Sequence, residues 1–176
     1  MVHVHLVAFL RNVNQGQRGH PSTADLVDAF RAVGAGEVVA FQSNGTVLFT
    51  ARDAAVGVRE LLATKGVFDD AIEVRSLAFI ERIVVDHAGA ADGGRRELTL
   101  FDAAQRLGEA SIVRHAASRR RCAVIDDGPG WAVVLNDQDR QSNGTPTVQA
   151  VIGAPATSRG LPTLSRLVER FVERAE

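Results

Sequence analysis

The stretch Phe9–Phe49 constrains the fold of this chain more than any other part of it. An apolar strand ends at Leu10 and runs into a polar loop that contains glycine. Ser22, with Asp25 three residues later, is a capping-box pattern that starts a helix. Two runs of β-forming residues follow, joined by Ser-Asn-Gly, and an Asn-Gly step between such runs predicts a hairpin with Gly45 at positive φ. A strand, a helix and a β-hairpin are therefore expected in this order.

The same half of the chain continues with a second helix and a fourth strand. Asp53 is in position to cap the helix, which ends at Gly66. The strand Ala71–Arg75 alternates apolar and polar residues. Residues 1–76 then follow the order β-α-β-β-α-β, which is typical of a ferredoxin-like fold. The apolar stripe of the second helix is expected to comprise Ala54, Val58, Leu61 and Leu62.

Residues 77–176 repeat this order loosely. Asp102 is expected to cap a short helix that ends at Leu107, and the small-residue loop Ala88–Gly94 is the candidate hinge between the halves. The other expected elements are helix Leu77–Val85, strands Glu97–Phe101, Arg121–Asp126 and Trp131–Asn136, helix Thr145–Gly153, and a terminal amphipathic helix over 162–175 with the stripe Leu164, Leu167, Val168, Phe171, Val172 and Ala175. The sequence thus predicts an α+β fold of two ferredoxin-like halves, 1–76 and 77–176, in one compact chain.

Composition excludes several classes of function. The 176 residues carry a formal net charge of −1, which gives no global attraction for nucleic acid or membranes. Cys122 is the only cysteine, so a disulfide framework is excluded and a reducing compartment fits best. No apolar run approaches the roughly 20 residues that span a bilayer, and no signal-peptide pattern is present. We therefore expect a cytoplasmic protein with no membrane partner. No nucleotide-binding or nucleophile-elbow motif occurs, and no cofactor is expected.

The order of these motifs resembles a known bacterial family, the domain of unknown function 1697. Members begin with a strand, a motif of the form Arg-Gly-Ile-Asn-Val-Gly-Gly, a helix and a Gln-Ser-Gly-Asn-Val-Val-Phe hairpin. The matching positions here are Arg11, Val13, Asn14, Gly16, Leu26, Gln42, Ser43, Val47 and Phe49, with Thr157-Ser158-Arg159 before the last helix. Asn12, Gln15 and Gly160-Leu161 depart from the family's residues. The resemblance implies two ferredoxin-like halves and implies no activity.

The polar loop after the first strand is the candidate ligand site. A guanidinium at the end of an apolar strand is costly unless it is paired or meets a ligand, and N–H groups near a helix start hold anions. The competing interpretation is that Arg11 pairs with an internal acid, such as Asp25 or Glu37, and only braces the fold. The candidate ligand-binding residues of the loop are Arg11, Asn14, Gly16, Arg18 and His20, to which the family motifs add Ser43, Asn44 and Arg159.

Three other features carry weaker hypotheses. His3 and His5 share one face of the first strand, but a metal site needs about three or four ligands, and no sequence cluster supplies the rest. No metal is therefore expected. Cys122 lies in an apolar run and is interpreted as a core residue. The arginines of Arg114–Arg121 form a basic patch, which we interpret as a solvated loop because aromatic residues for base stacking are missing.

The sequence favours a small protein that binds an anionic small molecule, a phosphate or a carboxylate, through the loop after the first strand. It does not establish whether catalysis follows. The alternative is a non-catalytic interaction or oligomerisation module, which includes a homodimer. A nucleic-acid binder that uses Arg114–Arg121 is the least favoured alternative.

Overall fold

The computed structural model describes residues 4–51 and 56–172. The chain separates into two units, Met1–Phe79 and Ile80–Glu176. Each unit has its own four-stranded sheet and its own hydrophobic core. The division falls within helix α3 (Leu77–His87), upstream of the Ala88–Gly94 loop.

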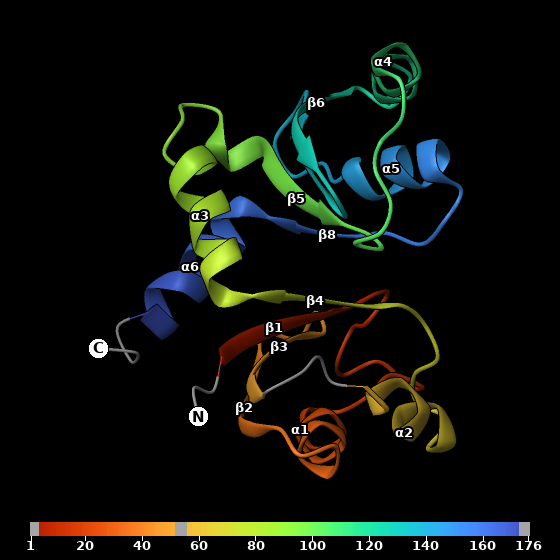
Figure 1. Cartoon of the computed structure of the whole chain (residues 1–176), viewed down its shortest axis with the longest axis vertical. Helices are drawn as coiled ribbons and strands as arrows, with labels where there is room; N and C mark the ends of the chain where they lie inside the picture. The colour runs from red at the N-terminus through yellow and green to blue at the C-terminus, as the bar shows by residue number, and fades with distance from the viewer. Residues whose placement is uncertain (1–3, 52–55, 173–176) are drawn as a thin grey trace. The chain divides into compact units, whose positions relative to one another are not determined.

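The first unit is an antiparallel sheet with two helices on one face (Figure 1). Its elements are, in chain order, β1 (Val4–Leu10), α1 (Thr23–Ala32), β2 (Gly36–Phe41), β3 (Thr46–Ala51), α2 (Val58–Thr64) and β4 (Ile72–Ser76). The strands lie in the order β2-β3-β1-β4, and all neighbouring pairs are antiparallel. This is the ferredoxin-like arrangement, so the fold predicted for this half is confirmed.

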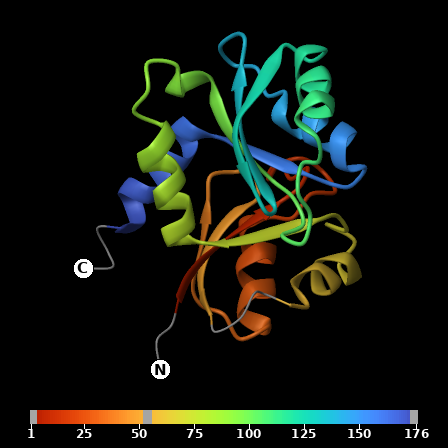
Figure 2. The ribbon, with the colours of Figure 1, turned by 45° about the horizontal axis from the view of Figure 1, so that its top comes forward.

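The core of the first unit lies between the sheet and its helices. The turned view of Figure 2 shows α1 and α2 on the same side of this sheet. Ser22 Oγ accepts the Asp25 N–H at 3.1 Å, and the Asp25 carboxylate accepts the Ser22 N–H at 3.0 Å, so the capping box of α1 is confirmed. Leu26 and Phe30 of α1 are fully buried, and the ring of Phe30 lies 4.8 Å from that of Phe49 on β3, centroid to centroid. Burial of these apolar faces stabilises the unit.

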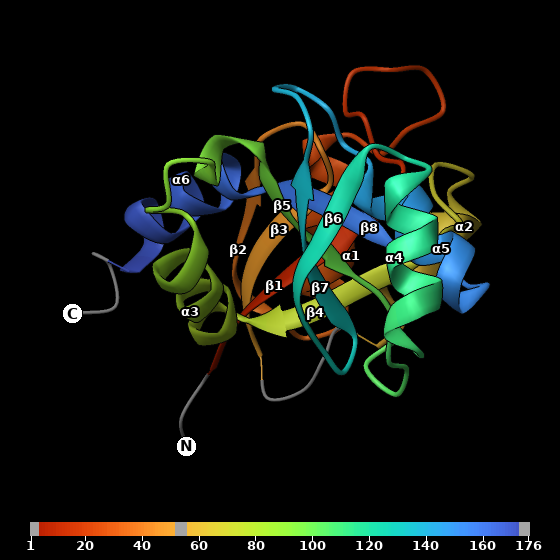
Figure 3. The same ribbon diagram turned by 90° about the horizontal axis from the view of Figure 1, so that it is seen from above.

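The second unit repeats the same topology. Its elements are the rest of α3, the 3-10 turn η1 (Gly93–Arg95), β5 (Arg96–Leu100), α4 (Ala110–Ser118), β6 (Cys122–Gly128), β7 (Trp131–Asn136), α5 (Gly144–Ile152), β8 (Thr157–Gly160) and α6 (Leu161–Val172). The strands lie in the order β6-β7-β5-β8, again all antiparallel. Figure 3 shows α4 and α5 on the same side of this sheet. The predicted α+β fold of two similar halves is therefore confirmed.

The two units also agree in register. Val7 of β1 is opposite Arg75 of β4, and Leu98 of β5 is opposite Arg159 of β8. Each of these arginines donates a hydrogen bond of 2.8 Å to the carbonyl of the residue before it. The repeat that the sequence indicates only loosely thus extends to single side chains.

Two elements of the second unit differ from the prediction. The helix expected from Asp102 is a turn, in which Asp102 Oδ1 accepts the Ala104 N–H at 2.8 Å. The helix of this segment is α4, so Arg114 and His115 lie on a helix and not in a loop, which corrects the interpretation of the basic patch. The short strand β8 was also not predicted, because Thr-Ser-Arg-Gly carries no apolar residue.

The helix α2 begins later than the sequence suggests, at Val58, after Gly57 with φ 91°. Val58 and Leu62 are fully buried, whereas Leu61 is 38% exposed, so its place in the apolar stripe was wrong. Asp53 and Ala54 lie outside the described residues.

The stripe of α6 is buried as expected where the structure describes it. Leu164 and Leu167 are fully buried, and Phe171 is 4% exposed. Ala175 and the side chain of Val172 lie outside the described part of the chain. Within the described ranges, no helix has both the length and the apolarity needed to cross a membrane.

Candidate functional site

The candidate site lies in the loop between β1 and α1 of the first unit, which Figure 3 shows in red, projecting from the sheet. The loop is tied together by its own polar groups. His20 Nδ1 accepts the Asn14 N–H at 3.1 Å, and the Gln15 N–H donates to the Ser43 carbonyl at 2.8 Å. The first residue of α1 donates a further hydrogen bond to the Gln15 side chain at 2.8 Å. These contacts hold the loop against the β2–β3 turn and the start of α1.

Arg11 is paired within the fold. Its Nη1 lies 2.8 and 3.0 Å from the two carboxylate oxygens of Asp70. Asn12 Nδ2 donates to the same carboxylate at 3.0 Å. The side chains of Arg11 and Asp70 are 23% and 25% exposed, so water only partly screens the pair. This geometry fits the bracing interpretation of Arg11, although the acid is Asp70 and not Asp25 or Glu37.

The N-terminus of α1 is already occupied by a carboxylate of the chain. Asp25 accepts hydrogen bonds from Ser22 Oγ at 2.7 Å, from the Ser22 N–H at 3.0 Å and from Lys65 Nζ at 3.1 Å. The hydrogen bonds from Ser22, followed by that from Lys65, lower the pKa of Asp25 to about 2. A helix N-terminus attracts anions, and here Asp25 meets that demand. The negative charge of Asp25 therefore disfavours an external anion at the helix start.

The tip of the loop carries donors that have no acceptor among the described residues. The Arg18 side chain is exposed and makes no ion pair with any described residue. The N–H groups of Gly16, Arg18 and Gly19 likewise have no hydrogen-bond acceptor in the described ranges. Gly16 and Gly19 have φ values of 101° and 84°. Chain turns of this kind, with left-handed residues, form concave groups of N–H donors that suit anions.

Two non-glycine residues beside the loop adopt the left-handed conformation. Asn12 has φ 55° and Gln42 has φ 59°. The Gln15 side chain donates to the Gln42 carbonyl at 3.4 Å, which links the two segments. Such a conformation costs about 1 kcal/mol or more per residue, and backbone strain of this kind gathers at functional sites.

The remaining predicted site residues are placed as follows. Ser43 is exposed, and its carbonyl contacts the loop by a hydrogen bond. Asn44 stabilises its own turn by accepting a hydrogen bond from Thr46 at 2.8 Å. Arg159 belongs to the second unit, where it donates to Thr157 Oγ1 at 3.0 Å, and burial lowers its pKa to about 10. A pocket shared by Arg11, Ser43 and Arg159 stays a prediction.

The histidine and cysteine hypotheses are the weakest. His5 Nε2 lies 3.7 Å from Glu37 Oε2, and His3 is outside the described residues. In the part of the chain that the structure describes, no three His, Cys, Asp or Glu side chains gather in a metal-like group. Cys122 is buried, its Sγ is 3.2 Å from Thr147 Oγ1, and burial raises the pKa of its thiol. A reactive thiolate is disfavoured there, as the core interpretation expects.

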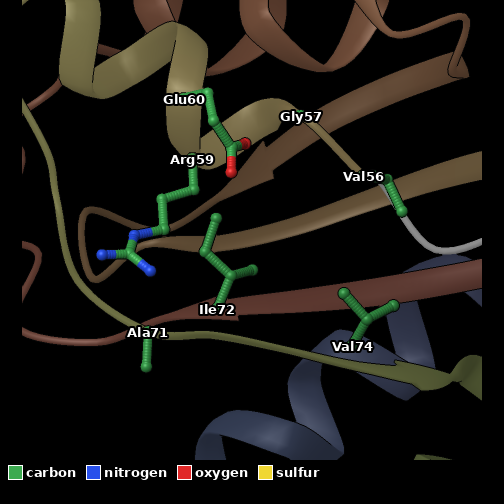
Figure 4. Close-up of a pocket in the computed structure, with 7 residues that line it drawn as sticks. All are labelled: Val56, Gly57, Arg59, Glu60, Ala71, Ile72 and Val74. Carbon is green, nitrogen blue, oxygen red and sulfur yellow. The ribbon is translucent and has the colours of Figure 1, made fainter.

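An open pocket of about 390 Å³ lies between the start of α2 and β4 (Figure 4). Its floor is aliphatic, with Ile72 and Val74 rising from β4 and Glu60 pointing toward Ile72. Arg59 on its rim is engaged by Asp69 at 2.7 Å, a contact that raises the pKa of Arg59. The polar groups of this pocket do not converge on one point, and none of the residues expected to bind a ligand lines it.

A buried polar network in the second unit was not anticipated from the sequence. Glu97 is 3% exposed, and Oε1 accepts the Gly144 N–H at 2.6 Å and Asn136 Nδ2 at 3.1 Å. Its Oε2 accepts from Ser142 Oγ at 2.6 Å. The carboxylate thereby caps the N-terminus of α5 from a neighbouring strand. The sequence signal was a glutamate directly before the run Leu98-Thr99-Leu100 of a strand.

The fold defines the class of protein: two consecutive ferredoxin-like units, each followed by a helix. The chain belongs to the family described as "Protein of unknown function (DUF1697)", whose model matches residues 4–123. No curated protein matches the sequence.

Among solved structures, a conserved bacterial protein, SP0830 from Streptococcus pneumoniae, is similar over 96% of this chain and 98% of its own, with a TM-score of 0.63 and 14% identity. That likeness shows the fold alone. The C. elegans NONO-1 homodimer structure matches with a TM-score of 0.24, 13% identity and coverage of 89% of this chain and 61% of that chain. The acetolactate synthase small subunit from Thermotoga maritima also has a TM-score of 0.24, with 14% identity and coverage of 90% and 97%.

Proposed function

We propose that the protein binds a small anion, a phosphate or a carboxylate, at the tip of the loop between β1 and α1. The observation that carries this proposal is the set of donors on Gly16, Arg18 and Gly19, for which the described part of the chain offers no acceptor. A guanidinium together with free main-chain N–H groups is the chemistry that recognises phosphate and carboxylate oxygens.

Arg11 is left out of the ligand set. Its guanidinium is held by Asp70, and moving it to a ligand would leave that carboxylate without its cation. In this proposal Arg11 fixes the base of the loop, while the positively charged guanidinium of Arg18 contacts the anionic ligand. The anchoring of Gln15 on Ser43 reduces the entropy that the loop loses on binding.

The proposal is tested by a residue-resolved NMR titration of the full chain with inorganic phosphate and, separately, with citrate. Saturable shifts are expected at the amide signals of Gly16, Arg18 and Gly19. Arg18→Gln removes the guanidinium and is expected to weaken binding by about tenfold or more, as for loss of one charge-assisted contact.

The matched control is Arg31→Gln, which removes an exposed guanidinium from the last turn of α1. It changes the net charge by the same amount and is expected to leave the titration unaltered. Shifts that never saturate, or equal weakening by both substitutions, would show a general charge effect and exclude a site at the loop.

A further inference from the structure

Five arginines of the second unit lie in segments of the chain that meet at one end of its sheet. Three of them, Arg119, Arg120 and Arg121, connect the end of α4 to the start of β6. The Arg121 carbonyl accepts the Asp137 N–H at 3.0 Å, which places the start of β6 beside the end of β7. The arginine face is defined here as Arg95, Arg119, Arg120, Arg121 and Arg140.

Arg95 and Arg140 join this end from two other segments. Arg95 Nη1 donates to the carbonyls of Asn136 at 3.2 Å and Asp137 at 2.9 Å. Arg140 lies three residues after Asp137, in the loop that leads to α5, and is exposed. Arg121 and Arg140 both adopt the left-handed backbone conformation, with φ 58° and 62°. This conformation costs free energy for a residue other than glycine, and the fold keeps it at both positions.

The charges of the arginine face are not neutralised by ion pairs. None of the five guanidinium groups forms an ion pair with a described residue. Two exposed carboxylates, those of Asp137 and Asp139, lie in the same loops, so five cations face two anions. The whole chain has a net charge of −1, so this excess of positive charge is local. A surface of this kind attracts a polyanion.

The side chains around the face narrow the choice of polyanion. A protein partner needs large apolar anchors, but next to Arg121 the chain has Cys122, which is buried, and Ala123, which is exposed but small. Single-stranded nucleic acid is held by aromatic stacking, and Trp131 lies at the opposite end of β7. Arginine forks bind phosphate groups without either kind of contact.

We propose that the arginine face binds the phosphate backbone of double-stranded nucleic acid without sequence preference. The contact is electrostatic, so the affinity falls as the salt concentration rises. The slope of the logarithm of the binding constant against the logarithm of the salt concentration becomes more negative by about 0.9 for each phosphate neutralised. The site is separate from the loop between β1 and α1, and either proposal can fail without the other.

The test measures the fluorescence anisotropy of a labelled duplex of about 20 base pairs with the full chain at about 50 and 200 mM salt. One variant combines Arg119→Gln, Arg121→Gln and Arg140→Gln. Its control combines Arg31→Gln, Arg106→Gln and Arg166→Gln, which removes the same charge from other exposed positions. Circular dichroism melting checks that both variants fold.

We expect the wild type to bind the duplex in a salt-dependent way. The face variant is expected to bind with an affinity about tenfold or more lower and with a shallower salt dependence. The control variant is expected to bind like the wild type. Absence of binding at the lower salt, or equal losses in both variants, would overturn the proposal. Equal or tighter binding of single strands, or of a poly-glutamate peptide, would also overturn it and assign the face to that partner.

Discussion

At the scale of single residues, Gly45 shows how one position joins a turn to the candidate site. It has φ +74°, as the Asn-Gly step predicted, and its carbonyl accepts the Leu10 N–H at 2.8 Å. A Cβ added there would lie 2.7 Å from Val13 Cβ and 3.1 Å from the Leu10 carbonyl oxygen. The glycine is therefore required both by its backbone and by the close approach of the loop after β1.

Gly45→Ala is expected to destabilise the protein by about 2 kcal/mol or more, since strain at positive φ adds to a steric clash. Gly34→Ala is the control, because Gly34 also has positive φ, 88°, but no atom within 4 Å of an added Cβ. It is expected to cost about 1 kcal/mol. Urea unfolding measures both, and equal losses would mean that the packing around Gly45 does not matter.

Asp25 is expected to make stability depend on pH in the acid range. The pKa of Asp25 is lowered from its ordinary value of 3.8 to about 2 in the folded chain, so its contribution to stability is complete above pH 4 and is lost as pH falls toward 2. Asp25→Asn should cost about 1 kcal/mol at pH 7, through the cap and Lys65. Chemical unfolding at several pH values measures this. A difference between wild type and variant that stays constant down to pH 2 would contradict the account.

At the scale of elements, local signals decided what the sequence could predict. α1 was predictable because its capping box and its buried face both lie within one short segment. α4 was missed because its N-cap, Glu109, makes no side-chain capping bond, while Asp102 imitates a cap in a turn. β8 depends on pairing with β5 and on contacts such as Ser158 to Thr99, 59 residues apart, which no local pattern reveals.

The capping of α5 by a distant carboxylate is open to test. Glu97→Ala leaves the Gly144 N–H and the Ser142 hydroxyl without their acceptor, so a loss of about 3 kcal/mol is expected. Glu109→Ala, at the exposed N-cap of α4, is the control and should change stability by less than about 0.5 kcal/mol. Denaturant unfolding that finds similar losses for both substitutions would refute the capping role.

The apolar stripe of α6 is expected to be structural. Phe171→Ala should cost about 3–5 kcal/mol, because its side chain is almost fully buried. Val85→Ala on α3, where the side chain is 75% exposed, should change stability little. Thermal and urea unfolding provide the comparison, and a loss below about 1 kcal/mol for Phe171→Ala would assign this residue a role outside the core.

At the scale of the whole molecule, element order was sufficient to predict two similar halves, whereas the site was only partly predictable. The sequence predicted a ligand site in the loop after β1, where the N–H groups of Gly16, Arg18 and Gly19 have no acceptor among the described residues. It could not identify the partner of Arg11, because Asp70 is 59 residues away along the chain. The family motif therefore combines a bracing residue, Arg11, with exposed residues such as Gly16, and sequence pattern alone does not separate these roles.

The central claim, that Arg11 braces the loop while Arg18 meets the anion, is tested most directly by melting temperatures with and without phosphate. Arg11→Met is expected to lower the melting temperature without ligand, since Asp70 loses its cation, and to retain the rise on adding phosphate. Arg18→Gln is expected to leave the ligand-free melting temperature unchanged and to reduce that rise strongly, because phosphate binds about tenfold or more weakly. The claim is contradicted if wild type shows no rise with phosphate, or if Arg11→Met abolishes the rise while Arg18→Gln retains it.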